Sequence, residues 1–175
     1  MDKNEHQSPD SPPPSIDWNE SYGGLLADYE PPDADLLRII DGLEPGWALD
    51  VGCGAGGLVV ALADRGWQVT GIDIADRAIE AARLILEDRG VTAELIHADA
   101  AAWRPDHQYD LIVSSFALPD RPARTEVLRM IRDATSPGGS VALKDFDSSM
   151  KRFGFFVEFD LVAIEDLTAA FEGFE

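Results

Sequence analysis

A cluster of glycines near residue 50 constrains the fold of this chain more than any other stretch. Residues 47–51 (Trp-Ala-Leu-Asp-Val) are mostly apolar, glycine fills four of the next six positions, and a helical pattern of apolar residues starts at Leu58. This order predicts a strand, a tight turn and the first turn of a helix. Glycines allow positive φ and a close approach to a ligand, and the free N–H groups of the first helical turn then face that ligand.

Strand-like and helical patterns alternate along most of the chain. Strands are expected at residues 47–51, 67–72, 92–97, 109–115 and 140–146. Helices are expected from residue 33, from the glycines to about residue 65, and at 76–89, 121–134 and 165–171, with a turn at 136–139. This alternation predicts an α/β fold with a Rossmann-like, doubly wound and mostly parallel sheet.

The domain organisation follows from length and composition. With 175 residues, the chain has the length of one domain, which we expect to span residues 16–175 after a disordered, proline-rich tail at 1–15. Within it we distinguish an N-terminal cap or flap (16–32), a core that binds the ligand (33–146) and a C-terminal Phe-rich segment (147–175) whose first part, from Phe153, is strand-like.

The charge of the chain restricts its partners. It carries 14 basic and 33 acidic residues, a net charge of −19. Such a field repels nucleic acid and anionic membranes and favours cationic ligands. Since the sequence has neither an apolar run of about 20 residues nor the apolar core of a signal peptide, the cytoplasm is the expected compartment. A single cysteine, Cys53, excludes an internal disulfide, and no His/Cys spacing suggests a metal site.

Carboxylates recur at the carboxyl ends of three successive expected strands: Asp50, Asp73 and Asp99. Ligands of such sheets bind outside these strand ends. A ligand with an ammonium group, a ribose and an adenine would use all three, with Asp50 near the ammonium, Asp73 on the ribose hydroxyls and Asp99 on the adenine amine. The turn amides would face its carboxylate. S-adenosylmethionine is that ligand, and S-adenosylhomocysteine is the expected product.

Four segments resemble the motifs of class I S-adenosylmethionine-dependent methyltransferases in order and spacing. They are residues 49–56 (Leu-Asp-Val-Gly-Cys-Gly-Ala-Gly), 71–74 (Gly-Ile-Asp-Ile), 98–100 (Ala-Asp-Ala) and 109–115 (Tyr-Asp-Leu-Ile-Val-Ser-Ser). The resemblance covers about residues 35–146. It implies that the cofactor contacts Asp50, Gly52, Cys53, Gly54, Asp73, Ile74, Asp99, Ala100, Ser115 and Phe116.

The N-terminal aromatics suggest a narrower likeness. Trp18 and Tyr22, with the compact C-terminal segment, resemble the small-molecule branch that includes thiopurine and tellurite methyltransferases. In that branch they would form a flap over cofactor and acceptor, with Tyr22 on the cofactor. The alternative is an N-terminal helix packed on the sheet.

The predicted reaction is methyl transfer to a small-molecule acceptor by in-line displacement, which depends mainly on positioning and on exclusion of water. Candidate acceptor contacts are Trp18, Phe116, Leu118 and Phe153. An oxygen or nitrogen acceptor also needs a base, for which the candidates are Tyr22, Asp120 and Asp145. Cys53 is interpreted as packing beside the cofactor.

Two other functions stay open. Glycines at 52, 54 and 57 match the dinucleotide fingerprint, which suggests an NAD(P)-dependent oxidoreductase, although a carboxylate at Asp50 would oppose a pyrophosphate. A non-catalytic S-adenosylmethionine-binding domain is the other alternative. Class I members usually end in an antiparallel strand pair, which this sequence lacks. Its open sheet edge would be covered by the Phe-rich stretch or by a partner, such as a second copy in a homodimer.

Overall fold

The computed structural model describes residues 17–21, 31–32, 34–154 and 160–174. Its strands are β1 (Trp47–Val51), β2 (Gln68–Asp73), β3 (Glu94–His97), β4 (Tyr109–Ser115) and β5 (Thr135–Lys144). Its α-helices are α1 (Trp18–Ser21), α2 (Ala34–Ile40), α3 (Gly57–Ala63), α4 (Asp76–Arg89), α5 (Ala123–Ala134) and α6 (Ile164–Ala170). A 3-10 helix, η1, spans Ser148–Phe153.

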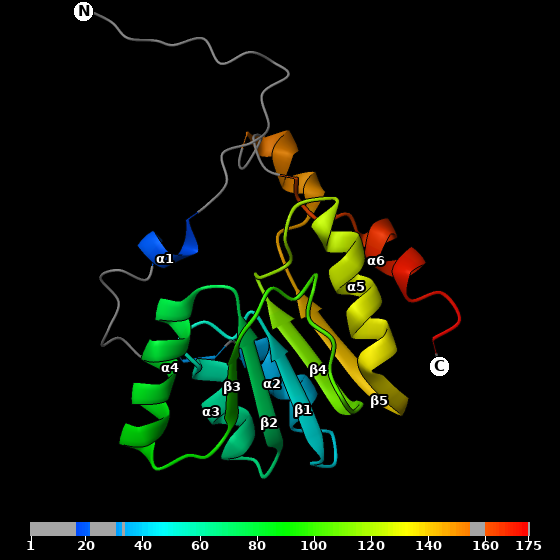
Figure 1. Cartoon of the computed structure of the whole chain (residues 1–175). Helices are drawn as coiled ribbons and strands as arrows, with labels where there is room; N and C mark the ends of the chain where they lie inside the picture. Colours follow the sequence, from blue (N-terminus) through cyan, green and yellow to red (C-terminus); the bar gives the residue numbers. More distant parts are fainter. Residues whose placement is uncertain (1–16, 22–30, 33, 155–159, 175) are drawn as a thin grey trace, which may run out of the picture.

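The five strands form one parallel sheet in the order β3-β2-β1-β4-β5 (Figure 1). The chain steps outward from β1 to β3, returns to β4 beside β1, and continues to β5. This confirms the predicted doubly wound α/β sheet. The reversal lies between β1 and β4, where such sheets bind their ligands at the carboxyl ends of the strands.

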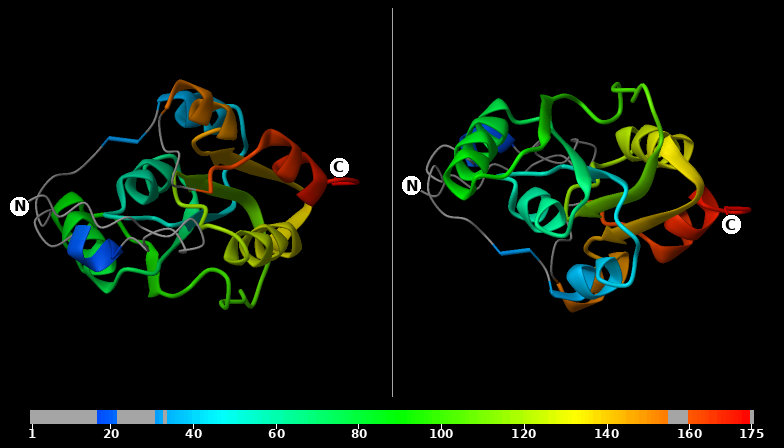
Figure 2. Two further views of the ribbon diagram at one scale, coloured as in Figure 1. Left: turned by 90° about the horizontal axis from the view of Figure 1, so that it is seen from above. Right: turned by 90° about the horizontal axis from the view of Figure 1, so that it is seen from below.

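Helices cover both faces of the sheet (Figure 2). Side chains of α2, α3 and α4 pack on one face with residues such as Ala48 and Val113, and α5 packs on the other with Leu49 and Ile112. Neighbouring strand residues therefore point to opposite faces, and both faces of β1 and β4 are buried, as their apolar sequences predict. This buried frame holds the ends of the strands in place.

Helix α4 matches its predicted range from Asp76 to Arg89. Its buried side carries Ile79 and Leu86, and it ends at Gly90, whose φ of 66° is the left-handed cap expected there. Helix α6 lies one residue from its predicted start and end.

Two expectations are wrong. The predicted turn at 136–139 belongs to β5, which begins at Thr135 and pairs with Tyr109, before the register with β4 shifts and resumes at Leu111 and Ser140. The proline and the two glycines there form an irregularity inside the strand instead of a turn before it. Phe153, expected in a strand-like stretch, ends η1 and is 65% exposed.

Other expectations lie outside the described residues: the tail, most of the N-terminal cap including Tyr22, the helix cap at Asp33, and the phenylalanines at 155, 156 and 159. In the part of the chain that the structure describes, strand pairing after β5 is a single bridge between Asp147 and Val162. In the same part, no helix combines the length and the apolar character needed to cross a membrane.

Candidate active site

A cavity of about 550 Å³ opens at the carboxyl ends of β1, β2 and β4. Eleven of the predicted site residues line it: Trp18, Gly52, Asp73, Ile74, Asp99, Ala100, Ser115, Phe116, Leu118, Asp120 and Asp145. Asp50, Cys53, Gly54 and Phe153 do not line it. The structure thus brings together most of the predicted site, on the strand ends where ligands of this fold bind.

The glycine turn is held in shape by backbone contacts. The N–H groups of Gly52 and Cys53 both donate to the carbonyl oxygen of Ile72, at 2.8 and 3.0 Å. Gly52 has a φ of 75°, and a Cβ atom there would collide with that of Ala117. Only glycine fits this position, because the backbone after β1 touches the loop after β4.

Asp73 ties the turn to the end of β2. One carboxylate oxygen accepts the N–H of Gly54 at 2.9 Å, and the other accepts the N–H of Ala75 at 2.8 Å. Each carboxylate oxygen has two lone pairs, so acceptor capacity remains on the side that lines the cavity. Asp73 is therefore fixed in place and can still bind hydroxyl groups.

Asp50 occupies an unusual environment. Asp50 lies in β1 between Gly71 of β2 and Val113 of β4, and it is only 2% exposed. Its Oδ2 atom has no hydrogen-bond partner among the described residues. Burial, reinforced by the carboxylate of Asp73, raises the pKa of Asp50 to about 7. A buried oxygen of this kind suits a nearby cation.

The wall beside the end of β3 is suited to an adenine. Asp99 accepts the N–H of Ala101 at 2.9 Å, which fixes the direction of its carboxylate. Ile74 and Ala100 also line the cavity, and Ile74 is exposed. Together they provide an apolar surface next to a hydrogen-bond acceptor.

Aromatic side chains form the wall after β4. Phe116 has the unusual φ of 54° and is 43% exposed. Its ring lies 4.7 Å from that of Phe146, centroid to centroid, and Lys144 places its ammonium 5.6 Å from the Phe116 ring. Backbone strain at a cavity-lining aromatic residue is typical of a functional position.

The two candidate carboxylate bases differ. Asp145 follows β5 and accepts the N–H groups of Phe146 at 2.7 Å and Leu118 at 3.3 Å. Burial raises its pKa, with those hydrogen bonds and the positive charge of Arg124 opposing the shift. Asp120 is exposed and lies 3.9 Å from a guanidinium nitrogen of Arg124. A carboxylate with a raised pKa accepts protons more readily, so Asp145 is the better base.

Sequence reasoning missed Arg124, which also lines the cavity and is 2% exposed. Its guanidinium donates to the carbonyl oxygens of Pro119, Leu161 and Asp160. It thereby fixes the segment that returns from residue 160 to the cavity wall. Its position in a helix of mixed polarity carried no signal of burial.

Cys53 is buried, and its Sγ atom lies 3.8 Å from the carbonyl oxygen of Gly54. Burial, with the Asp50 and Asp73 carboxylates nearby, raises the pKa of its thiol well above the usual value. A raised pKa disfavours the thiolate, which is the nucleophilic form of the side chain. Among the residues that the structure describes, no group of three His, Cys, Asp or Glu side chains could hold a metal ion.

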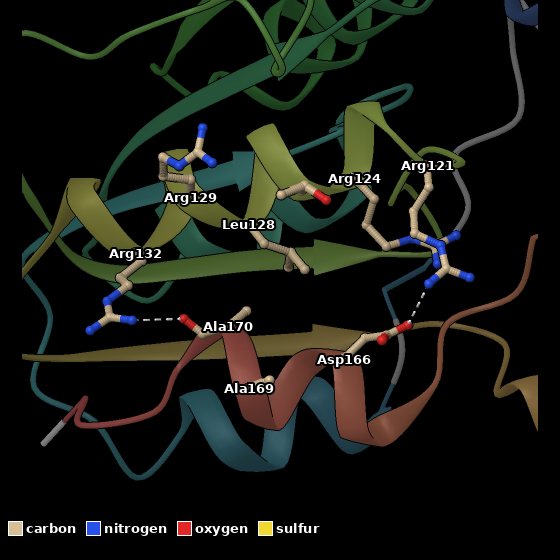
Figure 3. A pocket seen from close by; sticks show the side chains of 9 residues that line it. Arg121, Arg124, Leu128, Arg129, Arg132, Asp166, Ala169 and Ala170 are labelled. Atoms are coloured by element: carbon tan, nitrogen blue, oxygen red, sulfur yellow. Dashed lines mark hydrogen bonds and ion pairs between the residues drawn. The ribbon is translucent and has the colours of Figure 1, made fainter.

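A second hollow of about 480 Å³ lies between α5 and α6 (Figure 3). Arg132 donates to the carbonyl oxygens of Ala170 and Glu172 at 3.0 and 3.1 Å, while Arg121 lies 3.6 Å from Asp166. These arginines hold the two ends of α6 against α5 and leave the hollow between them.

Comparisons with known proteins agree with this arrangement. A family model described as "Methyltransferase domain" matches residues 48–139, more than half of the chain. The chain is 32% identical over 118 residues to the ubiquinone biosynthesis O-methyltransferase of Shewanella halifaxensis, covering 66% of this chain and 50% of that protein. It is 36% identical over 131 residues to the trans-aconitate 2-methyltransferase of Streptomyces coelicolor, covering 69% and 43%. The chain thus spans about half the length of these curated relatives.

Solved structures share the fold. The N-methyltransferase NodS of Bradyrhizobium japonicum, solved with S-adenosyl-L-homocysteine, superposes with a TM-score of 0.70 at 21% identity, covering 89% of this chain and 84% of that one. TehB of Haemophilus influenzae superposes with a TM-score of 0.60 at 23% identity, covering 64% and 40%.

Proposed function

The chain belongs to the methyltransferase domain family, and we propose that it is an S-adenosylmethionine-dependent methyltransferase that acts on a small molecule. The observation that carries this proposal is the cavity at the carboxyl ends of the strands, with Asp73 and Asp99 on its wall and the unpaired oxygen of Asp50 buried nearby. Relatives that act as methyltransferases support it.

The residues present fit this cofactor. Asp73 is held by two backbone N–H groups and has free lone pairs for the ribose hydroxyls. Asp99, Ile74 and Ala100 suit the adenine. The ammonium would offset the buried charge of Asp50, directly or through a water, and the turn residues Gly52–Gly54 would lie along the amino acid.

When bound, the cofactor supplies an activated methyl group. The chain then has to orient the acceptor, exclude water and remove a proton where the acceptor requires it. We assign orientation to Phe116 and Leu118 and, as a flap, to Trp18. All three line the cavity. Proton removal falls to Asp145, whose pKa is raised by burial. Tyr22 and Phe153 remain predictions from the sequence.

Titration calorimetry tests the proposal. We expect S-adenosylmethionine and S-adenosylhomocysteine to bind with a stoichiometry of one, and NAD(P) not to bind. NAD(P) binding without S-adenosylmethionine binding would favour the oxidoreductase alternative. Cofactor binding without S-adenosylhomocysteine formation in a broad acceptor screen would favour a non-catalytic binding domain.

A homodimer is proposed for the open edge of the sheet. In the described residues, β5 pairs along one edge only, with β4. Open edges invite pairing with another strand, and a second copy supplies an identical one. Sedimentation velocity should show a dimer, and a monomer at all concentrations would exclude it. The cytoplasm is the proposed compartment, as expected from the sequence.

A further inference from the structure

We propose that the acceptor is an amine attached to an apolar, preferably aromatic body, with the nitrogen bound at Asp145 and the body against Phe116 and Phe146. This inference rests on the proposed methyltransferase function and names the substrate class of the same cavity. The inference rests on three observations: the carboxylates of the cavity wall, the hydrogen bonds that already occupy Arg124, and the position of the aromatic rings.

The charges on the described cavity wall are strongly one-sided. Two of its carboxylates, Asp73 and Asp99, lie in the half assigned to the cofactor, and Asp120, Asp145 and Asp160 lie in the other half. Arg124 is the one basic residue among the described residues that line it. A cationic acceptor therefore meets a favourable potential, whereas a carboxylate or phosphate is repelled.

Arg124 does not offset the negative charge of the wall by offering its guanidinium to an anionic acceptor. Its side chain is buried and donates to the carbonyl oxygens of Pro119, Leu161 and Asp160. It also lies 3.5 Å from the Asp160 carboxylate. An anionic acceptor could recruit the guanidinium only by breaking these contacts, which would leave buried carbonyl groups unpaired.

Asp145 differs from the other two carboxylates of this half of the cavity. Asp160 is bound by the guanidinium of Arg121 at 2.9 and 3.1 Å, and Asp120 lies close to Arg124. For Asp145, the hydrogen-bond partners among the described residues are two backbone N–H groups. The positive charge of Arg124 acts on it from a distance, without a close ion pair among the described residues. A partly buried carboxylate without a close ion pair gains most from a cation supplied by the ligand.

The rings stand next to this carboxylate. Phe146 follows Asp145 in the chain, and its ring lies 4.7 Å from that of Phe116. Both rings line the cavity with Leu118 and Val162, so apolar side chains surround the carboxylate in this part of the wall. Aromatic rings pack well against an aromatic body. The Lys144 ammonium already lies 5.6 Å from the Phe116 ring, so the two rings are assigned to the body of the acceptor and not to its nitrogen. The same wall thus accommodates both parts of an arylalkylamine.

The chemistry balances with the groups present. The acceptor arrives as an ammonium, and one N–H proton passes to the Asp145 carboxylate, which frees the nitrogen lone pair. The nitrogen forms a bond to the methyl carbon while the carbon–sulfur bond breaks with its electron pair on sulfur. The product leaves as a methylated ammonium, and Asp145 returns its proton to water.

Binding to the complex with S-adenosylhomocysteine tests the proposal without turnover. The probes are 2-phenylethylamine, 3-phenylpropionate and 4-ethylphenol, which have similar bodies and different head groups. We expect the amine to bind at least ~10-fold more tightly than the other two, which corresponds to about 1.4 kcal/mol. With S-adenosylmethionine, the product should be the N-methyl amine. Equal or tighter binding of the acid or the phenol, or methyl transfer to their oxygen, would overturn the proposal.

One variant and its control test whether the amine binds at Asp145. Asp145→Asn should weaken amine binding about 10-fold and leave S-adenosylhomocysteine affinity unchanged, because it removes the charge and keeps the shape of the side chain. Asp88→Asn, an exposed position on α4, is the matched control and should change neither. Unchanged amine binding in Asp145→Asn would refute this site. Failure of S-adenosylhomocysteine itself to bind would refute the proposed function, whereas its binding without the amine would refute this inference alone.

Discussion

At the scale of single residues, the site combines two carboxylates that the fold treats in opposite ways. Asp73 is satisfied by the N–H groups of Gly54 and Ala75, whereas Asp50 is buried with one oxygen that has no partner among the described residues. Burial without a partner costs free energy in the unliganded protein. Asp50 therefore lowers the stability of the unliganded protein, which is typical of residues that bind a ligand.

The pH dependence of stability should reveal this cost. The pKa of Asp50 rises from 3.8 to about 7 on folding, so the folded chain holds one more proton between these values, and stability falls as pH rises through that window. Asp50→Asn should remove this fall and be more stable above pH 7, by an amount on the order of a few kcal/mol. Urea unfolding of the unliganded protein from pH 4 to 8 measures it. Asp88→Asn should keep the parent profile, and a parent-like profile in Asp50→Asn would contradict the assignment.

Asp73→Ala should weaken S-adenosylmethionine binding by about 1–3 kcal/mol, because the ribose hydroxyls lose their acceptor. The variant also frees the N–H groups of Gly54 and Ala75, so its melting temperature should fall. Calorimetry on this variant and on Asp88→Ala separates the effect from a general loss of charge. Unchanged affinity would show that the ribose binds elsewhere.

At the scale of elements, α6 is held through its ends. Arg132 of α5 donates to two carbonyl oxygens at its C-terminal end, and Arg121 pairs with Asp166 near its start, with the hollow between them (Figure 3). Burial contributes little here, since no residue of α6 is fully buried. The helix therefore depends on a few polar contacts.

Arg132→Ala should loosen α6. Loss of two hydrogen bonds at about 1 kcal/mol each speeds amide exchange in α6 by roughly 10-fold or more. Hydrogen exchange read by mass spectrometry measures this. Arg129→Ala is the control, because Arg129 pairs with Glu126 of its own helix. Equal exchange in the two variants would show that apolar packing holds α6.

At the scale of the whole molecule, the net charge of −19 sets the conditions in which the chain is stable. Carboxylates outnumber basic groups more than twofold, and like charges repel within a compact fold. Salt screens such repulsion over a distance of about 10 Å at 0.1 M.

Sodium chloride should therefore raise the melting temperature at pH 7.5. Near the isoelectric point of about 4.3 the same salt should have little effect, because the net charge that it screens is gone. Thermal unfolding from about 0.05 to 0.5 M salt at both pH values tests this. An equal rise at both pH values would point to salting-out instead.

Sequence patterns predicted the parallel sheet and the residues at its strand ends better than the burial of single side chains. The doubly wound parallel sheet and the positions of Asp73 and Asp99 on the cavity wall follow from local apolar runs and from the topology of α/β sheets, whereas Phe116 was predicted from the family resemblance. Asp50 was predicted to be a site residue, yet its absence from the wall was not foreseen. Burial of a residue near the end of a strand depends on what packs over it.

The wrong expectations share a physical cause. Pro137 and Gly138 are turn formers, but β4 offers pairing partners on both sides of them, and the strand absorbs them as a bulge. Phe153 has a high strand propensity, yet Asp147 caps a 3-10 helix that carries it to the surface. Arg124 is buried because carbonyl groups distant in sequence converge on it. In each case contacts within the folded chain, local for Phe153 and tertiary for the others, overrode the preference of the residue itself.

The collision that any side chain at position 52 would meet at Ala117 has a consequence for evolvability. The loops after β1 and β4 meet in a close contact between Gly52 and Ala117, the seam, which has no room for a larger side chain. Both halves of the cavity border the seam. Mutations that broaden the range of acceptors must then accumulate away from the seam, in segments such as 160–162 that border the cavity from the other side. A library directed there samples new specificities on an intact cofactor site.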